Sequence, residues 1–381
     1  MLLWGLATLR LHDADLATAA ARQAIALLPV FTPQGLATTL WALSRLYCHD
    51  VELLHRAAPV VRRSLAAFKP QDLANVAYAA ARARFADPDL FAALCGAAAH
   101  QMPAFPAQAV VNMVWACEQV GYAGHPEFVA AAARRGAQLL AAGSLQGRWL
   151  GSFVQSCVQL GFSAGLLLEA AGQRLTAASM ADLPSKALCQ LVVAAVAHAQ
   201  LPGRQQHQPQ QHARLVAAAL GELALRDVSD LSCPVAMTQL HQALLLHDPS
   251  SVQLPPSWQH ACRAAWHHVA AGCITDECRK DVASTLQRLS MQPQLLRWHG
   301  PVLVAIGVQL PSGQQVAVQL LADGHTLSSP AGALTGALEL EHACLRRQGW
   351  HIASISQAAW LRLGSVAERQ QALQAALQAA A

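Results

Sequence analysis

The sequence is organised around a period of 37 residues, which separates Phe31, Phe68 and Phe105. Each phenylalanine is followed within three residues by a proline and a glutamine. Seven residues after the glutamine stands a large aromatic residue followed by alanine. These aromatics are Trp41, Tyr78 and Trp115, with Trp4 one period earlier. A fixed period of this size predicts a stack of similar repeats, and such stacks usually present extended binding surfaces.

Within each repeat the pattern predicts a pair of helices. We expect the first to begin at its proline, because a proline at the first helical position lacks only an N–H that would have no partner there. These prolines are Pro33, Pro70 and Pro106, and Thr32 can cap the first of the helices. The spacing i, i+4, i+7 then predicts one buried apolar stripe. Its members are Leu36, Leu40 and Leu43, then Leu73, Ala77 and Ala80, then Val110, Val114 and Cys117. A second helix is expected at 51–67 and at 88–101.

The register loosens after the third repeat. Gln146 and Phe153 continue it at a spacing of 38, whereas Gly161-Phe162 follows Gly121-Tyr122 at a spacing of 40. A fifth, degenerate copy is predicted from Leu183-Pro184, with its stripe at Leu188, Val192 and Val196. We therefore predict helical-pair repeats over 1–200, a Gln/His-rich linker over 201–212, an irregular helical spacer over 213–298 and a C-terminal module over 299–381. Trp4 has the position in the first repeat that Trp41 has in the next, yet it is only the fourth residue of the chain. We therefore expect the first repeat to be truncated. We also expect a targeting peptide to have been lost with the missing upstream part.

Three sets of side chains are candidates for binding single-stranded RNA. The repeated polar residues Gln34, Gln71, Gln108, Thr38, Asn75 and Asn112 could contact bases, although helix capping and solvation explain the same pattern. The repeated aromatics could be platforms on which bases stack, but their place beside the apolar stripe favours the core between the helices. The pairs Arg62-Arg63 and Arg134-Arg135 could follow a phosphate backbone, or lie on an ordinary solvated face.

Composition excludes fewer classes of function than the repeat pattern does. Charged residues make up only 13% of the chain and the net charge is +4, which permits an anionic partner without requiring one. The ten cysteines form no paired framework, so reduced thiols in an intracellular compartment are expected. Cys262, Cys273 and Cys278 match no zinc-binding spacing, and we predict neither a metal nor a cofactor. The longest uncharged stretches are short or interrupted, so no membrane span is predicted.

The C-terminal module is predicted to be a small α/β domain. Residues 302–310 and 315–321 are expected to form a hairpin around Pro311 to Gly313. A helix is expected at about 338–348, a strand at 349–355 and a closing amphipathic helix at 358–380.

Both parts of the chain resemble known families. Asp323-Gly324, Gly349-Trp350 and Trp360, together with the strand before them, resemble the RAP domain, an RNA-binding domain. The Phe-x-Pro-Gln and Leu-Trp-Ala-Leu strings resemble octotricopeptide repeats of green-algal organelle proteins. The resemblance covers about 280 of the 381 residues. It implies a mostly α protein, an α-solenoid of helix pairs with a period of 37–38, followed by an α/β domain similar to restriction-endonuclease-like folds. It also implies an RNA-binding factor for chloroplast or mitochondrial transcripts, acting in their processing, stability or translation, with other organellar RNA-processing proteins as further candidate partners.

Two other functions remain open from the sequence. A protein-binding helical scaffold would use the same curved surface, and the low charge favours it. A metal-dependent ribonuclease would need converging carboxylates and usually a lysine. Asp323 lies where the RAP family has its strand-end aspartate, but Leu321 replaces a frequent glutamate and no lysine follows Lys280. Glu339 and Glu341 lie on the next helix, where the family tends to be basic. We therefore expect no catalytic activity.

Overall fold

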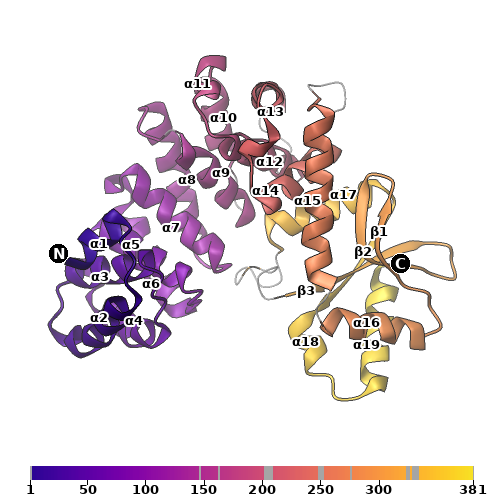
Figure 1. The fold of residues 1–381 in the computed structure, drawn as a ribbon, viewed down its shortest axis with the longest axis horizontal. Helices are drawn as coiled ribbons and strands as arrows, with labels where there is room; N and C mark the ends of the chain where they lie inside the picture. The colour runs from indigo at the N-terminus through magenta and orange to yellow at the C-terminus, as the bar shows by residue number, and fades with distance from the viewer. Residues whose placement is uncertain are drawn as a thin grey trace. The chain divides into compact units, whose positions relative to one another are not determined.

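The computed structural model describes residues 2–145, 147–161, 164–200, 209–247, 253–274, 277–322, 327 and 334–380. As predicted, the chain is mostly helical with a small C-terminal sheet (Figure 1). It divides into two compact units, with the main boundary between Arg174 and Leu175, and Leu327 belongs to the first unit. The first unit contains helices α1 to α10, and the second contains helices α11 to α19 and the sheet.

Two rows of helices make up the first compact unit. In the odd-numbered row each helix packs on the next: α1 (Leu2–Leu9), α3 (Pro33–Arg45), α5 (Pro70–Arg82), α7 (Ala107–Gln119) and α9 (Arg148–Gln159). The even-numbered row is built in the same way: α2 (Ala14–Leu27), α4 (Val51–Ser64), α6 (Pro88–Gln101), α8 (Pro126–Ala141) and α10 (Gly165–Arg174). Helices that follow one another in each row lie about one sequence period apart.

The C-terminal ends of the odd-numbered helices repeat in detail. Each is followed within two residues by one with positive φ. In α1, α3, α5 and α7 the N–H of the residue after it donates to a carbonyl five positions back, as in Cys48 N–H to Leu43 O at 3.0 Å. This geometry closes a helix by satisfying its last free carbonyls. The positive-φ residues are Arg10, Tyr47, Arg84, Gly121 and Gly161. Their spacings of 37, 37, 37 and 40 show that the sequence period is also a period of local backbone structure.

The even-numbered helices α2, α4 and α6 begin after aspartates that have the same period. Asp13, Asp50 and Asp87 each accept a hydrogen bond from the N–H three residues later, at 2.9, 2.9 and 3.0 Å. Such caps satisfy an N–H that otherwise has no partner and contribute about 1 kcal/mol each. The sequence analysis missed these aspartates although they are 37 residues apart. The helices close with short 3₁₀ turns at Leu28–Val30, Leu65–Ala67 and Met102–Ala104.

Several predictions within the repeat are confirmed. All nine members of the predicted apolar stripe are buried. The Thr32 side chain caps α3, and Pro33 and Pro70 are the first residues of their helices. Pro106, however, is the N-cap of α7 rather than its first residue. The reason is that Pro106 directly follows its phenylalanine, whereas Pro33 and Pro70 come one residue later.

Phe153, which the sequence assigns to the aromatic positions at a spacing of 38, differs from Trp41, Tyr78 and Trp115 in its burial. Its side chain is fully buried, and its ring lies against Gly136 of α8. The fourth repeat instead follows the spacing of 40 that joins Gly121 to Gly161. Gln146 and Phe162 lie outside the described residues. In the predicted fifth copy, Leu188, Val192 and Val196 are buried on α12 (Ser185–Gln200), in the second compact unit.

The second compact unit combines helices with a sheet of order β1-β2-β3-β4. Its helices before the sheet are α11 (Ala177–Ala181), α12, α13 (Pro209–Ala224), α14 (Pro234–Leu246), α15 (Pro256–Ile274) and α16 (Glu277–Arg288). The strands are β1 (Gln294–His299), β2 (Val302–Gln309), β3 (Gln315–Leu321) and β4 (His351–Ser356). The first three strands are antiparallel, and β3 pairs in parallel with β4 through α17 (Gly336–Arg347). Two helices close the chain: α18 (Gln357–Leu361) and α19 (Val366–Ala380). The predicted hairpin and the predicted later strand are confirmed, whereas β1 was missed.

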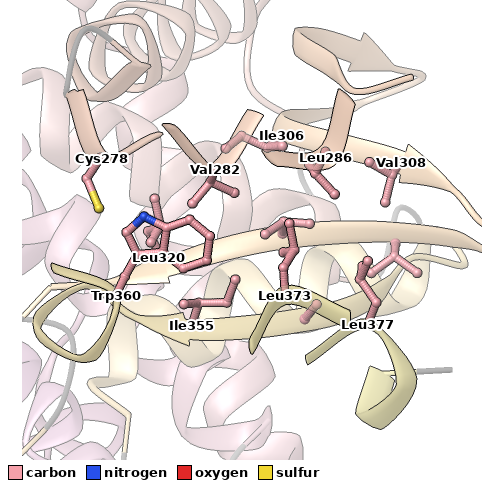
Figure 2. Packing of buried hydrophobic residues seen from close by; sticks show 13 residues of the cluster. Cys278, Val282, Leu286, Ile306, Val308, Leu320, Ile355, Trp360, Leu373 and Leu377 are labelled. Atoms are coloured by element: carbon pink, nitrogen blue, oxygen red, sulfur yellow. The ribbon is translucent and has the colours of Figure 1, made fainter. Parts of the chain in front are cut away.

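Helices cover both faces of the sheet. Figure 2 shows side chains of α16, α18 and α19 meeting those of β2, β3 and β4 in one apolar cluster. On the other face, Gln319 of β3 donates to Glu341 of α17 at 3.0 Å, and Trp350 packs on Gly307 of β2. The predicted module of residues 299–381 therefore packs on α16 and pairs with β1, both within the segment that the sequence assigns to the spacer.

Candidate nucleic-acid interface

One side of the odd-numbered row carries the predicted polar residues. On α3, Gln34, Thr38 and Trp41 follow the spacing i, i+4, i+7, which places them on one helix face. Gln34 is exposed, and Thr38 and Trp41 are partly buried. The same arrangement occurs on α5 and α7, which pack beside α3. We call these nine residues the polar stripe: Gln34, Thr38 and Trp41; Gln71, Asn75 and Tyr78; Gln108, Asn112 and Trp115.

The aromatics of the polar stripe are neither fully buried in the core nor fully exposed as stacking platforms, the two alternatives left by the sequence. Trp41, Tyr78 and Trp115 are partly buried, and Trp4 of α1 is 46% exposed. The rings of Tyr78 and Trp115 are neighbours, with centroids 5.2 Å apart and planes inclined by 35°. Each ring thus helps to join adjacent helices and still has a part of its surface at the outside.

A surface pocket of about 510 Å³ lies between α1 and α3 at one end of the polar stripe. Trp4 and Phe31 supply aromatic surface to it, and Gln34 and Thr38 supply polar groups. An opening of this composition can hold a planar group between a ring and hydrogen-bonding side chains.

Two arginines that the sequence analysis missed extend the polar stripe. Arg45 and Arg82 follow Trp41 and Tyr78 by four residues, so each lies one turn further along the same face of its helix. The guanidinium carbon of Arg82 lies 5.5 Å from the ring centre of Tyr47, which is 66% exposed. Both arginines are partly buried. Their spacing of 37 was the available signal, but the third repeat has Gln119 in this position.

Histidines surround the same exposed tyrosine. The rings of His12 and His49 have centroids 5.0 and 6.5 Å from that of Tyr47. Burial and, secondly, the charge of Arg82 lower the pKa of His49. Near neutral pH His49 is therefore neutral, and Arg82 supplies a fixed positive charge beside Tyr47.

The arginine pairs predicted from the sequence lie elsewhere. Arg62 and Arg63 are on α4, and Arg134 and Arg135 are on α8, in the even-numbered row. Arg62 forms an ion pair with Asp89 at 2.9 Å, and Arg135 donates to the carbonyl of Phe105 at 3.1 Å. The structure does not bring these pairs onto the helices of the polar stripe, and two of the four side chains already have partners within the protein.

The candidate residues of the C-terminal module that can be placed have structural roles. Gly349 adopts φ +81° where α17 ends. Trp350 is 4% exposed. Trp360 is 1% exposed, and its indole N–H donates to Asp281 at 2.9 Å. Asp323 and Gly324 lie outside the described residues.

No group of three or more histidine, cysteine or acidic side chains in the described ranges is arranged to hold a metal ion. Of the acidic residues on α17, Glu341 is bonded to Gln319, and burial raises its pKa above the usual range. Among the residues that the structure places, no helix is both long and apolar enough to cross a membrane. The chain matches no protein-family model, and comparison with curated proteins gives no match.

Proposed function

We propose that this chain binds single-stranded RNA along the polar stripe, without catalysis of its own. The observation that carries the proposal is the recurrence of an exposed glutamine, a partly buried Thr or Asn and a partly exposed aromatic on three adjacent helices. A surface that repeats at the spacing of packed helices suits a polymer whose own groups repeat.

The chemistry of the polar stripe fits the parts of a nucleotide. Amide side chains both donate and accept hydrogen bonds, as the edges of bases do. An aromatic ring that stacks on a base contributes about 1–3 kcal/mol with little sequence preference. Arg45 and Arg82 lie on the same helix faces. They can reach phosphates, since one guanidinium group can donate to two phosphate oxygens at once. The ring of Tyr47 beside Arg82 limits the freedom of that side chain.

The wider assignment is part of the same proposal. It takes the two helix rows as an α-solenoid, the C-terminal sheet and its helices as a RAP-like domain related to restriction-endonuclease-like folds, and organellar transcripts as the target. It is supported by the resemblance of the sequence motifs and by the recurrence of the caps at 37 residues.

A helical scaffold for a protein partner is the second candidate function. It is favoured by the low charge of the chain, 13% of residues, and by the aromatic character of the polar stripe. Peptide binding and RNA binding differ in salt dependence, because only the polyanion releases condensed counterions when it is bound.

Fluorescence anisotropy with a labelled 20-nucleotide oligouridylate at several KCl concentrations tests the proposal. We expect Arg82→Gln to weaken binding severalfold and to reduce the slope of log affinity against log salt by about 0.7, the contribution of one phosphate on a single strand. Arg63→Gln, which removes an exposed arginine on α4, is the matched control and should bind as the wild type. Equal losses from both variants, or no binding at low salt, would refute RNA binding along the polar stripe.

A further inference from the structure

A cluster of aromatic side chains lies in the second compact unit, remote in sequence from the repeats. Trp298 of β1 meets Trp266 of α15 edge to face, with ring centroids 5.5 Å apart. His241 of α14 packs on both, at 5.5 and 6.3 Å. Trp266 is buried, whereas Trp298 is only partly so. The cluster fixes the orientation of an indole ring at the surface.

Arg263 lies over the face of this indole. Its guanidinium carbon is 4.1 Å from the centre of the Trp298 ring, a cation–π contact at short range. The Arg263 side chain is exposed, and within the described part of the chain no carboxylate forms an ion pair with it. The guanidinium is thus held over the ring, and no acidic side chain in the described ranges is paired with it.

The surroundings of Arg263 are also cationic or neutral. His260 and His267 are exposed and lie one turn before and after it on α15, at i−3 and i+4. Neither α15 nor β1 contains an acidic residue. Burial lowers the pKa of His241. The hydrogen bond with the carbonyl of Pro301 partly opposes this shift, and the charge of Arg263 adds to it. That ring is therefore neutral near pH 7, and the fixed positive charge of this surface comes from arginine.

We propose that this surface, Arg263 and Trp298 with the exposed side of α15, is a second nucleic-acid contact that binds a phosphodiester of single-stranded RNA. The guanidinium donates in its plane to two phosphate oxygens, because its stacking on Trp298 leaves the N–H groups at its edge open to solvent. Its outer face can receive a base, since guanidinium planes stack on bases as they do on aromatic rings. An acidic peptide would bind the positive charge of Arg263, but it would have no base to stack on the outer face of the guanidinium. The surface is distinct from the polar stripe and needs no residue of it.

The test uses the full chain and the same labelled oligouridylate. We expect Arg263→Gln to weaken binding about fivefold and to lower the salt slope by about 0.7, as for one lost phosphate contact. Arg263→Lys should restore only part of the affinity, because lysine keeps the charge but loses the planar, stacked donor. Arg288→Gln is the matched control, since Arg288 is exposed on α16, which covers the opposite face of the sheet.

The outcomes separate this inference from the proposed function. If Arg82→Gln weakens binding and Arg263→Gln does not, the second contact is refuted while the polar stripe stands. If only Arg263→Gln weakens binding, the second contact stands and the polar stripe fails. Full affinity of Arg263→Lys would overturn the stacked geometry, and an equal loss from Arg288→Gln would show a general effect of charge. Ultraviolet crosslinking of 4-thiouridine RNA should yield peptides from α15 or β1, and their absence would count against the contact.

Discussion

Gly136 should not tolerate even the smallest side chain. It lies within α8, and an added Cβ would be 2.8 Å from Cζ of Phe153 and closer still to Cε1. The Phe153 ring is fully buried, so it cannot move aside without disturbing the core between α8 and α9. Overpacking of this kind costs roughly 1–3 kcal/mol, and contact with two ring carbons places it near the upper end. Alanine recovers about 1 kcal/mol of helix propensity. We therefore expect Gly136→Ala to destabilise the first compact unit by about 2 kcal/mol.

Differential scanning calorimetry measures this effect directly. For a unit of this size, about 2 kcal/mol corresponds to a Tm lower by roughly 4–8 °C. Gly96→Ala is the matched control on α6, where the nearest atom to an added Cβ is His125 Nε2 at 3.6 Å. It should raise the Tm by a few degrees, because it gains helix propensity without a clash. Phe153→Leu in the Gly136→Ala background should recover part of the loss. An unchanged or higher Tm for Gly136→Ala would refute the close packing of Phe153 against Gly136.

Two further predictions concern the second compact unit. Arg226→Met should lower the stability of this unit by about 2–4 kcal/mol. Arg226 donates to the carbonyls of Met180 and Ala181 and pairs with Glu222 at 2.9 Å, and in the variant these groups would have no partner. Thermal unfolding followed by circular dichroism checks this, and full stability of Arg226→Lys would contradict the need for a branched donor. Glu341→Gln should stabilise the protein at pH 7 more than at pH 4.5. Burial raises the pKa of the Glu341 carboxyl in the folded state, so the wild type loses stability as pH rises from the usual pKa toward the raised one. Melting temperatures of both proteins from pH 4.5 to 7 measure the difference, and parallel curves would refute it.

Much of the first compact unit could be predicted because its information is local and repeated. The apolar stripe, the Thr32 cap and the helix pairs follow from residue type and spacing over one or two turns. Asp50 and Asp87 were equally readable, since an aspartate before a helical pattern is a common cap. The strand β1 was missed because Leu295-Leu296 breaks the alternation of apolar and polar residues, which leaves only four alternating residues, Leu296 to His299.

The candidate site was predicted in part for the same reason. Residues on one helix face, such as Gln71, Asn75 and Tyr78, can be assigned from helical periodicity. Arg45 and Arg82 could have been assigned in the same way, because they follow Trp41 and Tyr78 by four residues. Only packing decides which helix lies in which row, and which guanidinium already has a partner.

The sequence alone determined the period, the helix ends and the faces of single helices, because these depend on backbone sterics and on neighbours within about four residues. The tertiary structure decided which faces meet. It placed Phe153 in the core, put the predicted arginine pairs on α4 and α8 of the even-numbered row, and set Arg263 of α15 on Trp298 of β1. These outcomes depend on contacts between residues far apart in the chain, where the volumes of side chains and the cost of unpaired polar groups select one arrangement.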